Sequence, residues 1–445
     1  MPRWPVCPRL AETGRARAGR MGRRGYCLRW VLLLVPLLFF LERQAGYAAC
    51  RAIADLAAQG AYGVADRSGR IVDTCHPDQS LVPASVLKIA TVSAALAILG
   101  PDHRFRTEFF LDGHNNLFIK GFGDPTLVSE EIVGIVERLR EQGVRRVQTL
   151  YVDTSAFALT RQVPGQEDSD NPYDAPVGPL SVNFNSVPIV KDAAGRIVSG
   201  ETQTPTLAIM QELGQGRTPG HARVNICVQG CNADARMAQY GGELFRALLA
   251  QGGIPVAAQG GIRTVPPEGA ALVHTHHSAQ VLTEISRSTL HYSSNFMANL
   301  IFLACGAKQF GYPATWQKAG QAVHRELARQ LGNAAAESIV QVEGAGLSRD
   351  NRVTVRAMLQ LLTRFRPQIE LLNKERGVAV KTGTLTGVYN LAGYLPDGQA
   401  FVILLNQPTN NRAAVLERLK RQYASGPPAT GRQTVSIAPG SRMEK

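Results

Sequence analysis

The sequence predicts an α/β chain of the α+β kind, in which one domain of helices and strands is divided by an inserted, mainly β/α region. Three observations indicate this organisation. An apolar, alanine-rich helix is predicted over Val86–Leu99. Short strands and loops prevail from Arg104 to about Pro267, with two helical patches among them. From about Ala271 onward, long helices return and are followed by three strands.

Local signals support the elements of the first half. Pro83 precedes the first helix and Gly100 follows its last apolar residue, as expected at the two ends of a helix. In the inserted region, runs of β-branched and aromatic residues predict short strands. The strands cover Phe105–Leu111, Leu117–Lys120, Val147–Val152 and Val224–Val228, and the helical patches cover Glu130–Glu141 and Gly242–Gln251.

The second half begins with Thr283–Cys305, which we predict to be mostly helical. Ser and Asn are unfavourable inside a helix, so a local break is expected where they occur in this segment. Three strands are predicted after it, at 376–383, 388–395 and 399–406. A last helix over Asn411–Tyr423 would turn Leu416 and Leu419 toward the core.

Composition divides the chain into five segments. They are an export segment (1–49), the first part of the main domain (50–101), the inserted region (102–270), the second part of the main domain (271–424) and a tail (425–445). The tail is rich in Gly, Pro and Ser and is expected to be disordered. Within the inserted region, the Pro/Gly/Asp-rich stretch 164–179 predicts a loop of the kind that often borders a binding site.

Length and composition are those of an ordinary globular protein. The chain has 445 residues, of which 44% are hydrophobic and 19% charged, enough for two or three domains. Its formal charge is +13, but residues 1–49 hold nine Arg and two Glu, so the remainder carries about +6. The Arg residues are dispersed and no nucleic-acid-binding motif occurs, which argues against a nucleic-acid partner.

The first helix carries a candidate nucleophile and base. Ser85 and Lys88 are three positions apart, so they share a helix face. A serine hydroxyl needs a neighbouring base, and a lysine can serve when burial and other cations lower its pKa. The start of the helix also favours developing negative charge near Ser85.

Two further motifs offer polar groups for the same chemistry. Ser293 and Asn295, in Ser293-Ser294-Asn295, supply a hydroxyl for proton relay and an amide for a peptide backbone. Lys381, Thr382, Gly383 and Thr384 follow the β-branched strand residues Gly377–Val380. Lys381 could hold a carboxylate, Gly383 permits close backbone approach, and a strand edge can pair with an extended peptide.

The scarcity of lysine argues against a chance occurrence of these motifs. Only nine of the 48 basic residues are Lys, yet Lys88 and Lys381 both fall within them. Arg could replace most exposed cations, but it cannot act as a base because it does not deprotonate in proteins.

These three motifs, in this order, resemble the S-x-x-K, S-x-N and K-T-G set of penicillin-recognising serine enzymes. The wider chain, from about Cys50 to about Tyr423, resembles class C low-molecular-mass penicillin-binding proteins, the D-alanyl-D-alanine carboxypeptidase/endopeptidase family. The additional matching segments are Gly100–Glu108, Leu117–Gly121, Gly123–Leu127, Tyr173–Val177, Leu180–Asn185, Gly344–Arg349 and Leu391–Leu395.

The resemblance implies a penicillin-recognising transpeptidase/β-lactamase-like fold, with an antiparallel sheet flanked by helices. It implies a serine DD-peptidase that acts on peptidoglycan stem peptides through an acyl-enzyme and is acylated by β-lactams. The backbone N–H groups of Ser85 and Thr384 would form the oxyanion hole. No cofactor is implied.

The sequence departs from the family pattern at three places. Asn299 stands where the family usually has Glu, and Phe122 replaces a small residue in a Gly-x-Gly-Asp-Pro turn. The segment from Arg349 to Lys381 is short and lacks the usual Gly-x-Asp-Gly stretch. Two alternatives therefore stay open, a β-lactamase and a catalytically silent protein that binds β-lactams or peptidoglycan.

The N-terminus predicts export to the periplasm or another extracytoplasmic site. Arg23 and Arg24 precede the apolar stretch Trp30–Leu41, which is short for a membrane span, and small residues follow before Cys50. Met21 could be the true start. Twin-arginine export and a lipoprotein site at Cys50 fit loosely, and an uncleaved anchor or peripheral membrane association stays open.

Five of the seven cysteines lie beyond the export segment. In an oxidising compartment, Cys50 with Cys75 and Cys227 with Cys231 are two candidate disulfides, which leaves Cys305 buried and free.

A metal site is not predicted. Cys227 and Cys231 lack further ligands nearby, and the run His274-Thr275-His276-His277 is more typical of a polar domain junction than of a metal centre.

Overall fold

The computed structural model describes residues 50, 53, 55–159, 163–228 and 230–424. The predicted export segment and tail lie outside the described residues. Within the described ranges, no helix is both long enough and apolar enough to cross a membrane.

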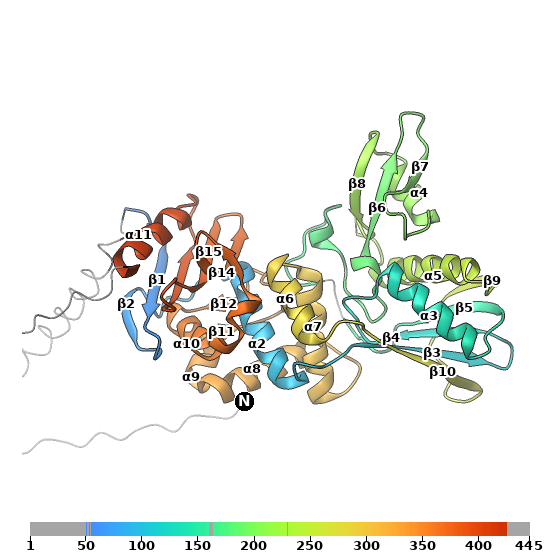
Figure 1. Ribbon diagram of the computed structural model, residues 1–445, viewed down its shortest axis with the longest axis horizontal. Coiled ribbons are helices and arrows are strands. Elements are labelled where there is room, and N and C mark those ends of the chain that lie inside the picture. Colours follow the sequence, from blue (N-terminus) through green and yellow to red (C-terminus); the bar gives the residue numbers. More distant parts are fainter. Residues whose placement is uncertain (1–49, 51–52, 54, 160–162, 229, 425–445) are drawn as a thin grey trace, which may run out of the picture. The chain divides into compact units, whose positions relative to one another are not determined.

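A six-stranded antiparallel sheet forms the centre of the motif-bearing domain (Figure 1). Its strands, in spatial order, are β13 (Asn373–Glu375), β14 (Val378–Leu385), β15 (Val388–Tyr394), β16 (Ala400–Leu405), β1 (Gly60–Ala65) and β2 (Ile71–Cys75). The chain therefore enters the sheet at the inner strand β1, which pairs with β2 on one side and with β16, from the C-terminal part of the chain, on the other. This pairing joins the two parts of the domain that the inserted region separates in sequence.

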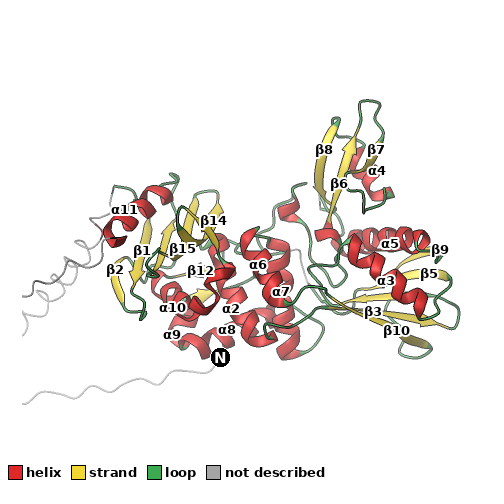
Figure 2. Cartoon of the chain, in the orientation of Figure 1, coloured by secondary structure: helices red, strands yellow, loops and turns green. Residues whose placement is uncertain are grey.

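Both faces of this sheet are buried, which explains the continuous apolar run in β16. Val402 and Leu404 pack into the large core beneath the helices, whereas Phe401 and Ile403 pack into a second core on the opposite face. Leu416 and Leu419 belong to that second core, as the sequence predicted. Helices consequently flank both faces of the sheet (Figure 2).

The main domain contains the helices and 3-10 segments that carry or support the motifs. Their bounds are η2 (Ala84–Leu87), α2 (Lys88–Leu99), α6 (Leu282–His291), α7 (Asn295–Phe310), α8 (Trp316–Leu331), α9 (Asn333–Glu337), α10 (Val355–Phe365), η5 (Arg366–Leu371) and α11 (Arg412–Ala424). α2 ends at Gly100, whose φ of 91° is left-handed, as expected after a helix. The predicted break in the long segment after Thr283 is present at 292–294, between α6 and α7.

The inserted region builds a separate five-stranded sheet. Its spatial order is β10 (Ala270–His277), β3 (Arg106–Asp112), β4 (Leu117–Gly121), β5 (Val147–Asp153) and β9 (Val256–Ile262). The pairs β4–β5 and β5–β9 are parallel, and each is connected through a helix, α3 (Ser129–Glu141) or α5 (Ala233–Gln251). Apolar residues of both helices share one core with this sheet.

A smaller sheet lies within the same insertion. β7 (Ile197–Ser199), β6 (Ser186–Lys191) and β8 (Gly220–Asn225) pair in that order, together with α4 (Ala208–Gly214). Two short strands of the main domain, β11 (Ile339–Val340) and β12 (Arg352–Val353), pair with each other. Two further 3-10 turns of the described chain are η3 (Pro172–Asp174) and η4 (Asn183–Asn185).

The end of the insertion lies later than expected. The sequence placed it at residue 270, but β10 pairs with β3 from Ala270 to His277. We therefore propose that the inserted region extends to His277. β10 also carries the histidine run, in which successive residues point to opposite faces of the sheet.

The two candidate disulfides are both present. Cys50 is bonded to Cys75 at the end of β2, and Cys227 is bonded to Cys231 before α5. Cys305 is a buried free thiol, as predicted. Because the sulfurs of Cys227 and Cys231 are bonded to each other, they are not available as metal ligands.

Candidate active site

The segment before Ser85 is clamped onto the central sheet. Asn390 of β15 donates from Nδ2 to the carbonyls of Val82 (2.9 Å) and Pro83 (2.8 Å). The Oδ1 atom of Asn406 accepts from the backbone N–H of Val82 at 2.8 Å. Ser85 itself lies in η2, directly before α2. The segment that contains Ser85 is therefore positioned by side chains of the sheet as well as by its own helix.

Lys88 is fully buried, and its amine makes three short contacts. Nζ lies 2.8 Å from Ser85 Oγ, 2.8 Å from Asn295 Oδ1 and 2.8 Å from the carbonyl oxygen of Ala345. The structure thus brings together residues of the first two motifs and a loop that follows them in sequence.

The three groups around Lys88 Nζ differ in the hydrogen bonds that they can make. An amide oxygen and a backbone carbonyl oxygen can only accept hydrogen bonds. In a neutral Lys88 amine, two N–H groups satisfy Asn295 and Ala345, which leaves the nitrogen lone pair for the Ser85 hydroxyl. The arrangement therefore allows Lys88 to accept the Ser85 proton.

Electrostatics favour this neutral form. Burial disfavours the ammonium and holds the pKa of Lys88 well below the ordinary lysine value. The positive charge of Lys381 lowers the pKa of Lys88 further, and the carboxylate of Glu343 acts in the opposite direction.

The second motif lies at the break between α6 and α7. Ser293 has a φ of 54°, in the left-handed region that serine seldom adopts. Ser294 caps α7, because its side chain accepts from the N–H of Met297. Asn295 uses both ends of its amide, Oδ1 toward Lys88 and Nδ2 toward the carbonyl of Tyr173 at 3.3 Å.

A buried carboxylate organises the loop that contacts Lys88. Glu343 is fully buried and accepts from four successive backbone N–H groups, those of residues 345–348. It also accepts from Asn351 Nδ2 at 2.6 Å. Sequence reasoning missed Glu343 and Asn390, although Glu343 directly precedes the matching segment Gly344–Arg349.

β14 brings the third motif beside Ser85. A Cβ atom on Gly383 would lie 2.8 Å from the carbonyl oxygen of Pro83 and 3.2 Å from the nitrogen of Ser85, so only glycine permits this approach. β13 pairs with β14 only as far as Val380. Among the described strands, residues 381–385 have β15 as their sole partner, so this part of β14 is an edge.

Lys381 is nearly buried, with 3% of its surface exposed. Burial lowers its pKa to about 8, and Arg412 contributes in the same direction while Glu375 opposes it. Nζ donates to the carbonyl of Thr382 at 3.1 Å. Lys381 therefore changes its charge close to neutral pH.

A cavity of about 740 Å³ is lined by residues of all three motifs. From the main domain it is lined by Ser85, Ser293, Asn295, Thr382, Thr384 and the segment 347–350. The predicted loop of the inserted region supplies Gly165, Glu167, Asn171, Tyr173 and Asp174. The predicted loop therefore borders the cavity that Ser85 lines.

Polar contacts hold the inserted loop in place. The side chain of Asp174 accepts from the N–H of Glu167 at 3.2 Å and from the hydroxyl of Ser169. Asn225, at the end of β8, donates from Nδ2 to the carbonyls of Ser169 (3.1 Å) and Asp174 (2.8 Å). The loop is therefore attached to the small sheet of the insertion.

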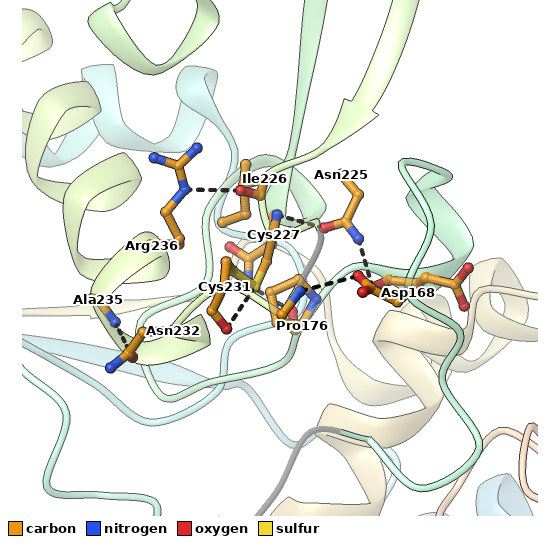
Figure 3. Close-up of a disulfide and its surroundings, with 12 residues drawn as sticks. Asp168, Pro176, Asn225, Ile226, Cys227, Cys231, Asn232, Ala235 and Arg236 are labelled. Carbon is orange, nitrogen blue, oxygen red and sulfur yellow. Dashed lines mark hydrogen bonds between the residues drawn. A yellow bond between two sulfur atoms is a disulfide. The ribbon is translucent and has the colours of Figure 1, made fainter. Parts of the chain in front are cut away.

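The disulfide Cys227–Cys231 lies beside this attachment (Figure 3). The N–H of Cys227 donates to Asn225 Oδ1 at 2.9 Å. The N–H of Gly230 donates to Asp168 Oδ1 at 3.4 Å. The cross-linked turn thus contacts the loop and the asparagine that anchors it.

The three departures from the family pattern have structural roles. Asn299 accepts from the N–H of Gly344 at 2.7 Å and so supports the loop at Glu343. Phe122 lies beneath the guanidinium of Arg106, 3.9 Å from the ring centre. The short segment before Lys381 contains α10, η5 and β13.

Comparison with known families gives a match over residues 53–375, to the D-Ala-D-Ala carboxypeptidase 3 (S13) family. A D-alanyl-D-alanine carboxypeptidase of Actinomadura sp. is 29% identical over 402 residues, which cover 74% of each chain. The D-alanyl-D-alanine carboxypeptidase DacB of Haemophilus influenzae is 25% identical over 395 residues, covering 73% of this chain and 80% of the relative.

Solved structures show the same fold. The crystal structure of penicillin binding protein 4 (dacB) from Haemophilus influenzae matches with a TM-score of 0.68 and 21% identity, covering 85% of this chain and 98% of that one. The same protein complexed with a β-lactam matches with a TM-score of 0.64 and 22% identity, covering 84% and 98%. The predicted fold class, a penicillin-recognising domain with an antiparallel sheet flanked by helices, is confirmed.

Proposed function

The chain belongs to the D-Ala-D-Ala carboxypeptidase 3 (S13) family and is a serine peptidase, and we propose that Ser85 is its nucleophile. The substrates are D-alanyl-D-alanine ends of peptidoglycan stem peptides and, in an endopeptidase reaction, D-alanine-linked cross-bridges. The observation that carries this proposal is the set of three 2.8 Å contacts around Lys88 Nζ.

In the first step, Ser85 Oγ attacks the carbonyl carbon of a D-alanine residue while Lys88 accepts its proton. The resulting ammonium is stabilised by Asn295 Oδ1, by the carbonyl of Ala345 and by the charge of Glu343. The backbone N–H groups of Ser85 and Thr384 would stabilise the oxyanion, since Gly383 lets β14 approach the serine.

Ser293 relays the proton to the leaving amine, and the C–N bond breaks to leave an acyl-enzyme on Ser85. Water then hydrolyses this ester, with Lys88 again serving as base. β-Lactams acylate the same oxygen, because their ring carbonyl takes the place of the peptide carbonyl. These groups supply the acid–base chemistry without a cofactor.

The substrate peptide lies along the open edge of β14, as an added strand. Asn295 contacts its backbone, and Lys381 with Thr382 holds the terminal carboxylate. In a cross-link, the same two residues face the bridging peptide instead.

Two disulfides in the described chain support an extracytoplasmic location, because such bonds persist in oxidising compartments. The predicted export segment agrees with this location. The partners proposed are peptidoglycan stem peptides and β-lactams, with peripheral membrane association as a further possibility to test by fractionation.

The test combines a fluorescent penicillin with a pentapeptide that ends in D-Ala-D-Ala. A stable adduct on Ser85 together with released D-alanine supports the proposal. Rapid penicillin hydrolysis without D-alanine release would indicate a β-lactamase, and an adduct without peptide turnover would indicate a silent binding protein.

Two variants assign the nucleophile. Ser85→Ala should abolish both labelling and D-alanine release. Ser68→Ala, in the exposed turn between β1 and β2, is the matched control and should leave both unchanged. Labelling of Ser85→Ala would show that another residue is the nucleophile.

A further inference from the structure

Arg412, the first residue of α11, reaches the third motif from outside the cavity. Its Nη1 atom donates to Thr384 Oγ1 at 2.7 Å and to the carbonyl of Gly383 at 3.3 Å. Thr384 lines the cavity, so the guanidinium contacts the side of this threonine that faces α11. No motif identified in the sequence contains Arg412.

The contact with Arg412 constrains the Thr384 hydroxyl. A hydroxyl has one proton to donate and two lone pairs to accept with, whereas a guanidinium can only donate. Oγ1 must therefore accept from Arg412, and its own proton is left to point elsewhere. The Thr384 hydroxyl is therefore oriented to donate a hydrogen bond to a group in the cavity. The positive charge of Arg412 behind it strengthens that hydrogen bond.

The local charge points to an anion. Lys381 and Arg412 are both close to this end of β14, and among the described residues no carboxylate forms an ion pair with either. Glu375 is the acidic group whose charge reaches both, and it is exposed. The charge of the exposed Glu375 carboxylate does not balance the charges of both Lys381 and Arg412. Net positive charge therefore remains where the end of a peptide would bind.

We propose that Arg412 is a positioning residue that makes the enzyme prefer peptides with a free terminal carboxylate over peptides whose end is an amide. It acts by orienting the Thr384 hydroxyl as a donor toward the carboxylate. This inference rests on the proposed function. It implies that Arg412 favours turnover of peptides that end in a free D-alanine carboxylate, the carboxypeptidase reaction.

The experiment measures kcat/KM for a D-Ala-D-Ala peptide and for the same peptide with a C-terminal amide. In Arg412→Gln, kcat/KM for the carboxylate peptide should fall about tenfold or more, mainly through KM, while the value for the amide changes little. Arg412→Lys should recover part of the preference. Arg418→Gln is the control on the same helix, because Arg418 pairs with Asp55.

Two readouts separate positioning from a merely structural role. In a Thr384→Val background, Arg412→Gln should have little further effect on the preference, because the two act as a unit. The alkaline limb of the pH profile should also move upward in Arg412→Gln, since removing this cation takes away a charge that lowers the pKa of Lys381 and leaves Glu375, which raises it.

An equal loss for both peptides in Arg412→Gln would overturn the inference and identify a structural role. A wild-type enzyme that is labelled by penicillin at Ser85 but does not distinguish the two peptides would also overturn it, with the proposed function intact. Absence of labelling and of turnover in the wild type would overturn both.

Discussion

Two loops border the cavity at Ser85, and they differ in origin and in construction. The loop at 343–348 belongs to the main domain and is organised by one carboxylate, Glu343, which is fully buried. The loop at 165–174 belongs to the inserted region and is held by Asp174 and Asn225, while its Tyr173 side chain is 63% exposed. One loop places the Ala345 carbonyl on Lys88, and the other places the Tyr173 carbonyl on the amide of Asn295.

Because of this difference, one loop affects the reaction at Ser85 and the other affects which peptides enter the cavity. A buried carboxylate that accepts five hydrogen bonds holds a loop in a single arrangement, which a general base needs in order to be oriented. A loop on the rim, attached to the small sheet of the insertion through Asn225, can change which substrates enter without moving Lys88. We therefore expect the main-domain loop to control acylation and the inserted loop to control selection among peptides.

The largest effect is expected for Glu343→Gln. The glutamine amide has one acceptor oxygen, and its NH₂ group would face the backbone N–H groups of the loop. We therefore expect a loss of about 3 kcal/mol in unfolding free energy. Penicillin acylation should slow about 100-fold, because the Ala345 carbonyl moves away from Lys88. Stopped-flow acylation and urea denaturation measure the two effects.

Glu326→Gln provides the control, since Glu326 is also nearly buried but lies on α8 and binds Arg329 and Gln330. It should lower stability and leave acylation intact. Equal acylation rates in both variants would show that the Glu343 loop does not orient Lys88.

A pH profile tests the charged groups on the main-domain side of the cavity. Lys381 must be protonated to hold a carboxylate, so kcat/KM for a carboxylate peptide should fall about tenfold per pH unit above a pKa of about 8. Lys88 must be neutral, so activity should rise with pH through its lowered pKa. Lys381→Arg keeps its charge, and an unchanged alkaline limb in that variant would exclude Lys381 as its source.

The smallest effect is expected for Asp174→Asn, the matching carboxylate-to-amide change in the inserted loop. Glu167 and Ser169 donate to different oxygens of Asp174, so Asn keeps an acceptor for one of the two contacts, and kcat/KM for peptides should fall about threefold. Penicillin acylation should keep the wild-type rate. A drop in acylation as large as that of Glu343→Gln would remove the distinction between the two loops.

Features that depend on short separations along the chain could be predicted from the amino-acid sequence alone. Ser85 and Lys88 share a helix start, Gly100 ends that helix, and the unfavourable Ser and Asn after Tyr292 mark the break before α7. These follow from helix geometry, backbone preferences and side-chain periodicity, which act over a few residues. The order of the three motifs and the matching segments then indicated the family.

How these residues act together depends on contacts between segments that lie far apart in the sequence. Asn295 and Ala345 reach Lys88 across 207 and 257 positions of sequence, and Asn390 reaches Pro83 across 307. Glu343 and Arg412 carry no local signal, because a carboxylate or guanidinium has the same sequence pattern whether it is solvated or directed at a catalytic loop. Their roles arise from burial and from the close approach of distant segments, which pairing β16 with β1 makes possible.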